Sequence, residues 1–327
     1  MARGIAAEAA YAAALGNHRR AARHLERAAR LADETGNPHA VGIVSLMKGL
    51  SSHLHGRFAL GLGHLTTAEQ IFRERCVGTH WELAAVRQYS LECLYYLGEL
   101  PRFESATTDG IKEAQDRGSL YAATTLRTGL TNAVWLLRDE PDRARHELDE
   151  AMKPWSSHGY HVQHWYELIA RTQIDLYTGA ARDAWDRMLR TWPALASSGL
   201  LHLQHARIVA LHLKARAAIA YAATNGPDKE ELLAVARRCA RGVWSEGDGW
   251  NRALSAAARA GIERVAGRPA SADAWLNRAL SNANTHGLAL LAAATEVACG
   301  DPRGAEWMTA RGVHDPGALA RMLLPGC

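Results

Sequence analysis

Small and apolar residues recur along the chain with a long, regular period. Short turns, each centred on a small residue after an apolar helix end, follow one another at spacings of 40, 42, 41 and 40 residues. One longer turn, AATNGPDKEE, interrupts the pattern near 222–231, after which it resumes. The turn centres are Gly16, Gly56, Gly98, Asp139, Gly179, Gly267 and Gly300. Repetition at this length is the signature of a repeat architecture.

The segment after most of these turns carries an apolar seam. Its members are separated by steps of four and three residues, which keeps them on one face of a helix. Small alanines let two helices approach closely, and a leucine or methionine fills the next layer. Each unit is therefore predicted to be a helical hairpin with the seam on its second helix. The seam positions are Ala21, Leu25 and Ala28; Ala144, Leu148 and Ala151; Ala184 and Met188; and Ala272, Leu276 and Ala279.

The offsets Gly16/Ala21/Leu25/Ala28 and Gly267/Ala272/Leu276/Ala279 resemble the short consensus of the tetratricopeptide repeat. Two departures stand out. The period exceeds the usual length of about 34 residues, and Gly61 and Phe103 replace the first alanine in the second and third units. The resemblance covers nearly the whole chain, and such longer units are similar to the sensor arrays of large bacterial ATPase regulators.

We therefore predict an all-α fold, a right-handed α-solenoid of about seven antiparallel helical hairpins with a C-terminal capping helix. The alanine-rich composition, with only three phenylalanines, suits closely spaced helices better than strands. The chain is expected to form one tetratricopeptide-like domain over 1–327. Its predicted units are 1–38, 39–79, 80–120, 121–160, 161–200, 201–245 and 246–286, with the cap at 287–327.

The C-terminal stretch EWMTARGVHDPGALARMLLPG adds a second resemblance. Asp315 followed by Pro316 predicts a helix start, and Pro325 with Gly326 predicts its end. The arrangement W-M-x-x-x-G-V-x-x-P…M-L-x-P-G is similar to the ends of very large bacterial Ser/Thr kinases that carry an ATPase module and a helical-repeat tail. The resemblance implies that this chain is the repeat portion of such a signalling protein, or a detached relative.

Catalytic motifs are missing from the sequence. None of the five lysines is followed by Ser or Thr, so there is no phosphate-binding loop, and HRD, DFG and GxSxG do not occur. We therefore expect no enzymatic activity and no cofactor in this chain, although a full-length parent could be a Ser/Thr kinase. HELDE at 146–150 lacks the second histidine of a zinc protease helix.

Charge and cysteine content indicate which partners and which cellular compartment to expect. The formal net charge is +4, but the basic residues are spread along the chain with acids between them, so no nucleic-acid partner is expected. The five cysteines are far apart and form no CxxC pair, which indicates a reduced, cytoplasmic setting without disulfides. The apolar segment GLALLAAATEVACG is too short to span a bilayer, so no membrane partner is expected.

The stretch HVQH at 161–164 could hold a metal ion, but it is repeated as HLQH at 202–205, 41 residues later. His39, His80, His164 and His205 are separated by 41, 84 and 41 residues. A structural position of a repeat recurs once in every unit, whereas a metal site has no reason to recur in this way. We therefore interpret these histidines as marking the start of the first helix of a unit, and we expect no metal site.

Three of these histidines form pairs with a second basic or imidazole side chain seven residues later. An i,i+7 step returns to the same helix face, so stacked hairpins are predicted to align the pairs along one groove. Such grooves bind extended partners, and arginine suits carboxylates through its bidentate fork. The candidate partner-binding residues are His80, Arg87, His164, Arg171, His205 and His212.

The sequence thus favours a non-catalytic protein–protein interaction scaffold, the regulatory or sensor region of a bacterial kinase–ATPase signalling protein, with an acidic peptide or protein as partner. Two alternatives stay open. A small-ligand-sensing domain of an ATPase-type transcriptional regulator would have a closed arrangement with an apolar cavity. An α-helical enzyme would have a cluster of perturbed carboxylates or histidines in that cavity.

Overall fold

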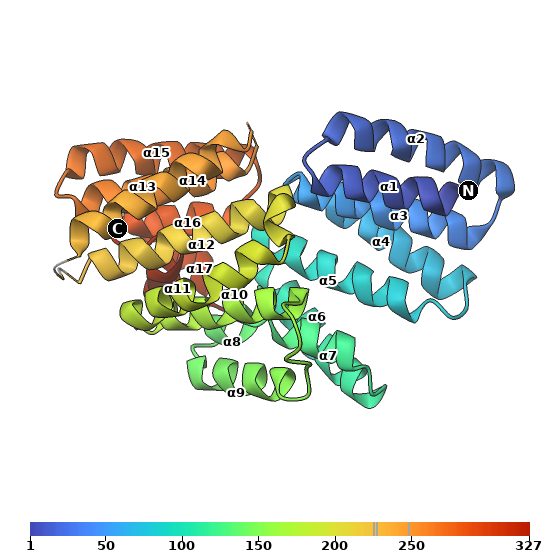
Figure 1. Ribbon diagram of the computed structural model, residues 1–327, viewed down its shortest axis with the longest axis horizontal. Helices are drawn as coiled ribbons and strands as arrows, with labels where there is room; N and C mark the ends of the chain where they lie inside the picture. Colours follow the sequence, from blue (N-terminus) through green and yellow to red (C-terminus); the bar gives the residue numbers. More distant parts are fainter. Residues whose placement is uncertain (225, 227, 248) are drawn as a thin grey trace.

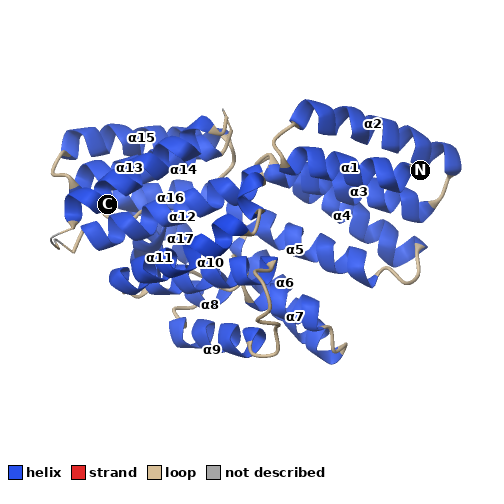
Figure 2. Ribbon diagram, in the orientation of Figure 1, coloured by secondary structure: helices blue, strands red, loops and turns tan. Residues whose placement is uncertain are grey.

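The computed structural model describes residues 1–327 apart from Asn225, Pro227 and Asp248 (Figure 1). Over these residues the chain forms α-helices, one short 3-10 helix and no strand, which confirms the predicted all-α class (Figure 2). The helices are α1 (Ala2–Ala14), α2 (His18–Thr35), α3 (Pro38–Leu54), α4 (Phe58–Arg75), α5 (His80–Leu97), α6 (Leu100–Asp116), α7 (Leu120–Arg127), α8 (Ala133–Leu137), α9 (Pro141–Met152), α10 (Val162–Tyr177), α11 (Ala181–Ser197), η1 (Leu200–His202), α12 (Gln204–Ala222), α13 (Lys229–Ser245), α14 (Asn251–Val265), α15 (Pro269–Thr285), α16 (Ala289–Ala298), α17 (Pro302–Thr309) and α18 (Pro316–Leu323).

Each turn centre found in the sequence separates two consecutive helices that pack against each other. All seven turn centres have positive φ, from 57° at Asp139 to 80° at Gly16. Glycine adopts this left-handed conformation without the steric penalty that a β-carbon brings. Asp139 is the one non-glycine residue with positive φ in the described part of the chain, and its carboxylate accepts a hydrogen bond from the Tyr177 hydroxyl at 2.8 Å.

The predicted seam residues are all buried, with 8% exposure or less. Phe103 and Gly61, which replace the first seam alanine in two of the units, occupy the same buried position on their helices. Phe103 is fully buried, and Gly61 lies where a β-carbon would come within 3.2 Å of the backbone of Gly49 and His53. Glycine at this position therefore allows α3 and α4 to approach more closely than an alanine would.

The fourth hairpin differs from the expected pattern because its first helix is broken into α7 and α8. The hydroxyls of Thr128 and Thr131 donate to the backbone carbonyls of Thr124 and Thr128, and such bonds compete with helical ones. Gly129 has positive φ and donates its N–H to the carbonyl of Tyr166 on α10 at 3.0 Å. The break places Leu130 between two interior pockets.

The C-terminal segment also differs from the single capping helix that we expected. It holds three helices, because the turn at Gly300 makes α16 and α17 a further pair before α18. The predicted start of α18 is confirmed, since the Asp315 carboxylate accepts the N–H of Ala318 at 2.8 Å. The longer turn near 222–231 lies between α12 and α13, and two of its residues, Asn225 and Pro227, are outside the described residues.

The chain folds back so that three early turns contact much later segments. Gly16 lies against Gln204, Gly56 against Trp250 and Gly98 against Trp307, and a β-carbon at any of these glycines would overlap the later side chain. Helix α16 packs on α5, and α18 packs on α10. Figure 1 shows α1–α4 and α13–α15 at opposite ends of the molecule, with α5, α10 and α12 between them. These central helices enclose the interior described next.

Candidate functional site

The interior holds two adjoining pockets, which share the side chains Leu130, Ile169 and Val209. The leucine pocket has a volume of about 60 Å³ and is lined by Tyr95, Tyr96, Leu130, Ile169, Gln173, Val209, His212, Leu213, Arg216, Leu254, Leu288, Leu290, Leu291 and Leu323. The histidine pocket has a volume of about 160 Å³ and is lined by Ala14, His53, Leu54, Tyr89, Glu92, Leu130, Val162, Trp165, Tyr166, Ile169, Leu203, His205, Ala206 and Val209.

Arg216 is the charged residue of the leucine pocket, and it is only 6% exposed. Its Nε and Nη2 are buried without a hydrogen-bond partner, and no acidic side chain lines the pocket. Burial lowers the pKa of Arg216, an effect that Tyr95 and Tyr96 partly oppose, but an arginine in a protein stays protonated. A buried positive charge without a partner destabilises the folded protein. An anion bound next to Arg216 would remove this destabilisation.

Two more unpaired polar groups line the same pocket. The Nε2 of His212 and the Oε1 of Gln173 are both buried without a hydrogen-bond partner. Burial first, and then the charge of Arg216, hold the pKa of His212 well below its usual value, so its imidazole is neutral. Because buried polar groups are nearly always paired, three unpaired groups around one apolar space indicate a ligand that would pair with them.

The local sequence explains how α12 presents these groups. His212 and Arg216 are one turn apart, so they lie on the same face of α12. That face is enclosed because α12 packs against α10, α11, α13 and α14. The surrounding residues of α12 are mostly alanine, isoleucine and leucine, which supply the apolar walls but no counter-charge.

The histidine pocket brings together His53 of α3, Glu92 of α5 and His205 of α12. His53 Nε2 lies 3.0 Å from Glu92 Oε2, and its ring centroid is 4.8 Å from that of His205. Burial alone would lower the pKa of His53, but hydrogen bonds with Cys93 and Glu92 raise it to about 10. Burial, and then the charge of His53, hold the pKa of His205 well below its usual value.

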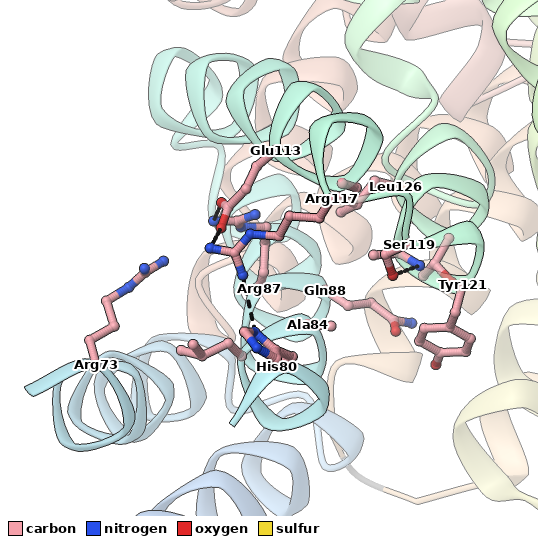
Figure 3. Close-up of a pocket in the computed structure, with 14 residues that line it drawn as sticks. Arg73, His80, Ala84, Arg87, Gln88, Glu113, Arg117, Ser119, Tyr121 and Leu126 are labelled. Carbon is pink, nitrogen blue, oxygen red and sulfur yellow. Dashed lines mark hydrogen bonds and ion pairs between the residues drawn. The ribbon is translucent and has the colours of Figure 1, made fainter. Parts of the chain in front are cut away.

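His80 and Arg87 lie elsewhere, in a third pocket of about 70 Å³ that we call the arginine pocket (Figure 3). Its basic and acidic side chains are Arg73, His80, Arg87, Glu113 and Arg117. Arg87 and Arg117 both pair with Glu113, and Arg117 Nη1 lies 3.2 Å from His80 Nδ1. Burial alone would raise the pKa of Glu113, but Arg87 and then Arg117 and Arg73 lower it. Arg87 and Arg117 thus share the Glu113 carboxylate, whereas Arg73 pairs with Glu69 of its own helix at 2.9 Å.

His164 and Arg171 line a further pocket between α10 and α11. Arg171 is paired within the chain, with Glu167 at 2.8 Å and Asp149 at 2.7 Å. Two of the three predicted pairs, His80 with Arg87 and His164 with Arg171, therefore line two separate pockets. The third pair lies in the interior, with His205 in the histidine pocket and His212 in the leucine pocket. The expected single groove is not formed, because α12 is enclosed by its neighbours whereas the first turn of α5 is at the surface.

The interpretation of HVQH as a helix start is confirmed. His161 is the N-cap residue of α10, and its backbone N–H donates to Nδ1 of His164 at 2.9 Å. The indole N–H of Trp155 donates to Nδ1 of His161 at 3.2 Å. These nitrogens are occupied in positioning the first turn of α10.

Sequence patterns did not identify Arg216, Gln173, His53 or Glu92 as site residues. The available signal was the pair His212 and Arg216 at an i,i+4 step inside the alanine-rich run of α12. No protein-family model, curated protein or solved structure matches this chain. Among the described helices, none is long and apolar enough to cross a membrane.

Proposed function

We propose that this chain is a ligand-sensing helical-repeat protein whose leucine pocket binds a small apolar molecule with a carboxylate group. The observation that carries this proposal is Arg216, a buried guanidinium without an acidic partner in a pocket with apolar walls. Arginine recognises carboxylates through two parallel hydrogen bonds. From the sequence, an apolar cavity was also the feature expected to distinguish a small-ligand sensor from a scaffold with an open interaction groove.

The ligand would satisfy the groups that the protein leaves unpaired. Its carboxylate would accept hydrogen bonds from Arg216, and its apolar part would lie among the leucine side chains. His212 Nε2 and Gln173 Oε1 would take further polar groups of the ligand or an ordered water. The pocket volume is about 60 Å³ and the adjoining one about 160 Å³. Since a cavity of about 150 Å³ admits benzene, the leucine pocket alone has room for a carboxylate with a short apolar chain, and a longer chain would need the adjoining histidine pocket as well.

The architecture links ligand binding to a signal. In this proposal the hairpins form a right-handed solenoid that closes on itself, and the leucine pocket lies where α5, α10, α12, α14, α16 and α18 meet. A ligand that contacts all of these helices favours the closed arrangement of the early and late hairpins. Such a change suits the cytoplasmic regulatory region of a bacterial kinase–ATPase signalling protein, the family that the C-terminal stretch resembles.

Thermal unfolding with simple probes tests this proposal. Butyrate, hexanoate and octanoate are expected to raise the melting temperature, and the matching primary alcohols to raise it much less, because only the acids neutralise Arg216. At a probe concentration one hundred times Kd, the stabilisation is about 2.7 kcal/mol. The proposal fails if acids and alcohols of the same length give the same shift, or if neither gives any.

The arginine pocket supports a second candidate function, recognition of an acidic peptide or protein partner. Arg87 and Arg117 both pair with Glu113, the only acid among the residues that line this pocket, so the two arginines leave one positive charge in excess there (Figure 3). His164 and Arg171 line a separate pocket, so they would contact the same partner only where it extends beyond the arginine pocket.

Fluorescence anisotropy with a labelled oligoglutamate peptide tests this second function. The double substitution Arg87→Glu and Arg171→Glu is expected to weaken binding by about tenfold or more, because it replaces attraction with repulsion. Arg182→Glu is the matched control, since the Arg182 side chain is 77% exposed and lines neither pocket. Equal affinities for the double variant and the control would exclude the arginines as a partner site.

A further inference from the structure

The histidine pocket contains a group of side chains whose chemistry the proposed function does not use. One nitrogen from each of His53 and His205 and one oxygen of Glu92 all lie within 4.8 Å of one another. The three residues come from α3, α5 and α12, so the fold-back of the chain, rather than any local spacing, brings them together. We propose that they bind a divalent transition metal ion, with zinc as the preferred metal.

The donor set fits this metal. Two imidazoles and one carboxylate are ligands that zinc uses in sites with three protein ligands and one open position. Tetrahedral zinc ligands about 2.0–2.2 Å from the metal lie roughly 3.3 Å from one another. His53 Nε2 and Glu92 Oε2 are already 3.0 Å apart, so a modest side-chain rotation that brings His205 closer completes the set.

The surroundings orient the two imidazoles. The second ring nitrogen of His53, Nδ1, lies 3.7 Å from Cys93 Sγ, which leaves Nε2 free to face Glu92 and the pocket. The ring of His205 stacks on Trp250 with a centroid distance of 5.1 Å and an interplanar angle of 25°. Histidine ligands to metals are regularly oriented by a hydrogen bond at the second ring nitrogen, and the contact of His53 with Cys93 is of this kind, whereas the Nδ1 of His205 is buried without a hydrogen-bond partner.

The pocket also supplies room for a fourth ligand. Its volume of about 160 Å³ adjoins all three side chains, and a water molecule fits easily into such a space. The hydroxyl-bearing rings of Tyr89 and Tyr166 line the same space. On binding, the metal ion would take the place of the proton that His53 shares with Glu92, and that proton would go to solvent.

The competing explanation is that His53 and Glu92 form only a buried ion pair that joins α3 to α5, with His205 as a packing neighbour. The two explanations differ in whether the protein binds a metal ion at a fixed geometry. Cobalt(II) is a suitable probe, because it replaces zinc in such sites and its visible spectrum reports the number and type of its ligands.

The experiment titrates Co²⁺ and then Zn²⁺ into the chelator-treated full chain. We expect an intense four-coordinate Co²⁺ spectrum without a thiolate charge-transfer band, which Zn²⁺ then abolishes. We expect Glu92→Gln and His205→Gln, which nearly keep the side-chain volume or length, to weaken Zn²⁺ binding by at least about a hundredfold, because each removes a ligand and the loss of a ligand's hydrogen-bond partner alone costs about 10–100-fold. One surface variant, His161→Gln, is the matched control and should bind Zn²⁺ like the wild type.

Three results would overturn the proposal. The wild type giving only the weak spectrum of hydrated Co²⁺ would show that no built site exists, and this readout needs no variant to fold. A thiolate band would place the metal on a cysteine instead. Unchanged Zn²⁺ affinity in Glu92→Gln and His205→Gln, with loss in His161→Gln, would assign the metal to the surface histidines. None of these results bears on carboxylate binding in the leucine pocket.

Discussion

Replacing Arg216 with methionine is expected to make the ligand-free protein more stable, even though Arg216 is buried. Methionine is long and unbranched, so it can fill the space of the arginine stem. The substitution removes a charge that has no partner in the described part of the chain, and exchanging buried charges for apolar groups can add about 1–4 kcal/mol to the free energy of unfolding. Urea denaturation of the wild type and the variant measures this difference.

Arg187→Met is the matched control for this prediction. Arg187 is partly buried, with 26% of its side chain exposed, and its Nε lies 2.9 Å from Asp175 Oδ2, whose side chain is only 10% exposed. Removing Arg187 leaves that carboxylate without its partner, so this variant should be less stable than the wild type. If Arg216→Met lost as much stability as Arg187→Met, Arg216 would be a structural residue and the ligand site would have lost its basis.

Trp250→Ala is expected to cost about 3–5 kcal/mol of the free energy of unfolding, the largest loss that we predict. The Trp250 ring is 2% exposed and lies 5.5 Å from Phe58 and 5.4 Å from Tyr96, measured between centroids. It also fills the space above Gly56, so it connects the second hairpin to the start of α14. Urea denaturation gives the loss, and hydrogen exchange should show faster opening at this contact.

Trp81→Ala provides the comparison, because Trp81 is the same residue type but 60% exposed. A surface substitution of this kind usually changes stability by less than about 0.5 kcal/mol. Similar losses in the two variants would mean that the contact between Gly56 and Trp250 does not hold the early and late hairpins together.

The local features of the fold could be predicted from the sequence. A glycine after an apolar helix end fixes a left-handed turn, and alanines at steps of four and three fix the buried face. These two rules located the turns from Gly16 to Gly300 and the buried seam. They even identified Asp139, which adopts the same positive φ without being glycine. Such rules act within a few residues, so one sequence is enough to apply them.

The interior site could not be predicted in the same way, because its environment comes from distant segments. Arg216 is unpaired only because α5, α10, α14, α16 and α18 enclose it without supplying an acid. The i,i+7 step places His205 and His212 on one face of α12. Whether that face meets solvent depends on how the hairpins pack, which the step does not reveal. The helix is broken at 128–132 because threonine hydroxyls donate hydrogen bonds to backbone carbonyls. The regular spacing of the turns gave no indication of this break.

Isothermal titration calorimetry of octanoate and octanol against the wild type and Arg216→Met tests the central claim most directly. The four affinities form a cycle that isolates the interaction between the carboxylate and the guanidinium. We predict that the wild type prefers octanoate by about tenfold or more, the effect of a charge-assisted pair of hydrogen bonds, and that Arg216→Met loses this preference. An equal preference for octanoate in both proteins would contradict the proposal that Arg216 recognises the ligand.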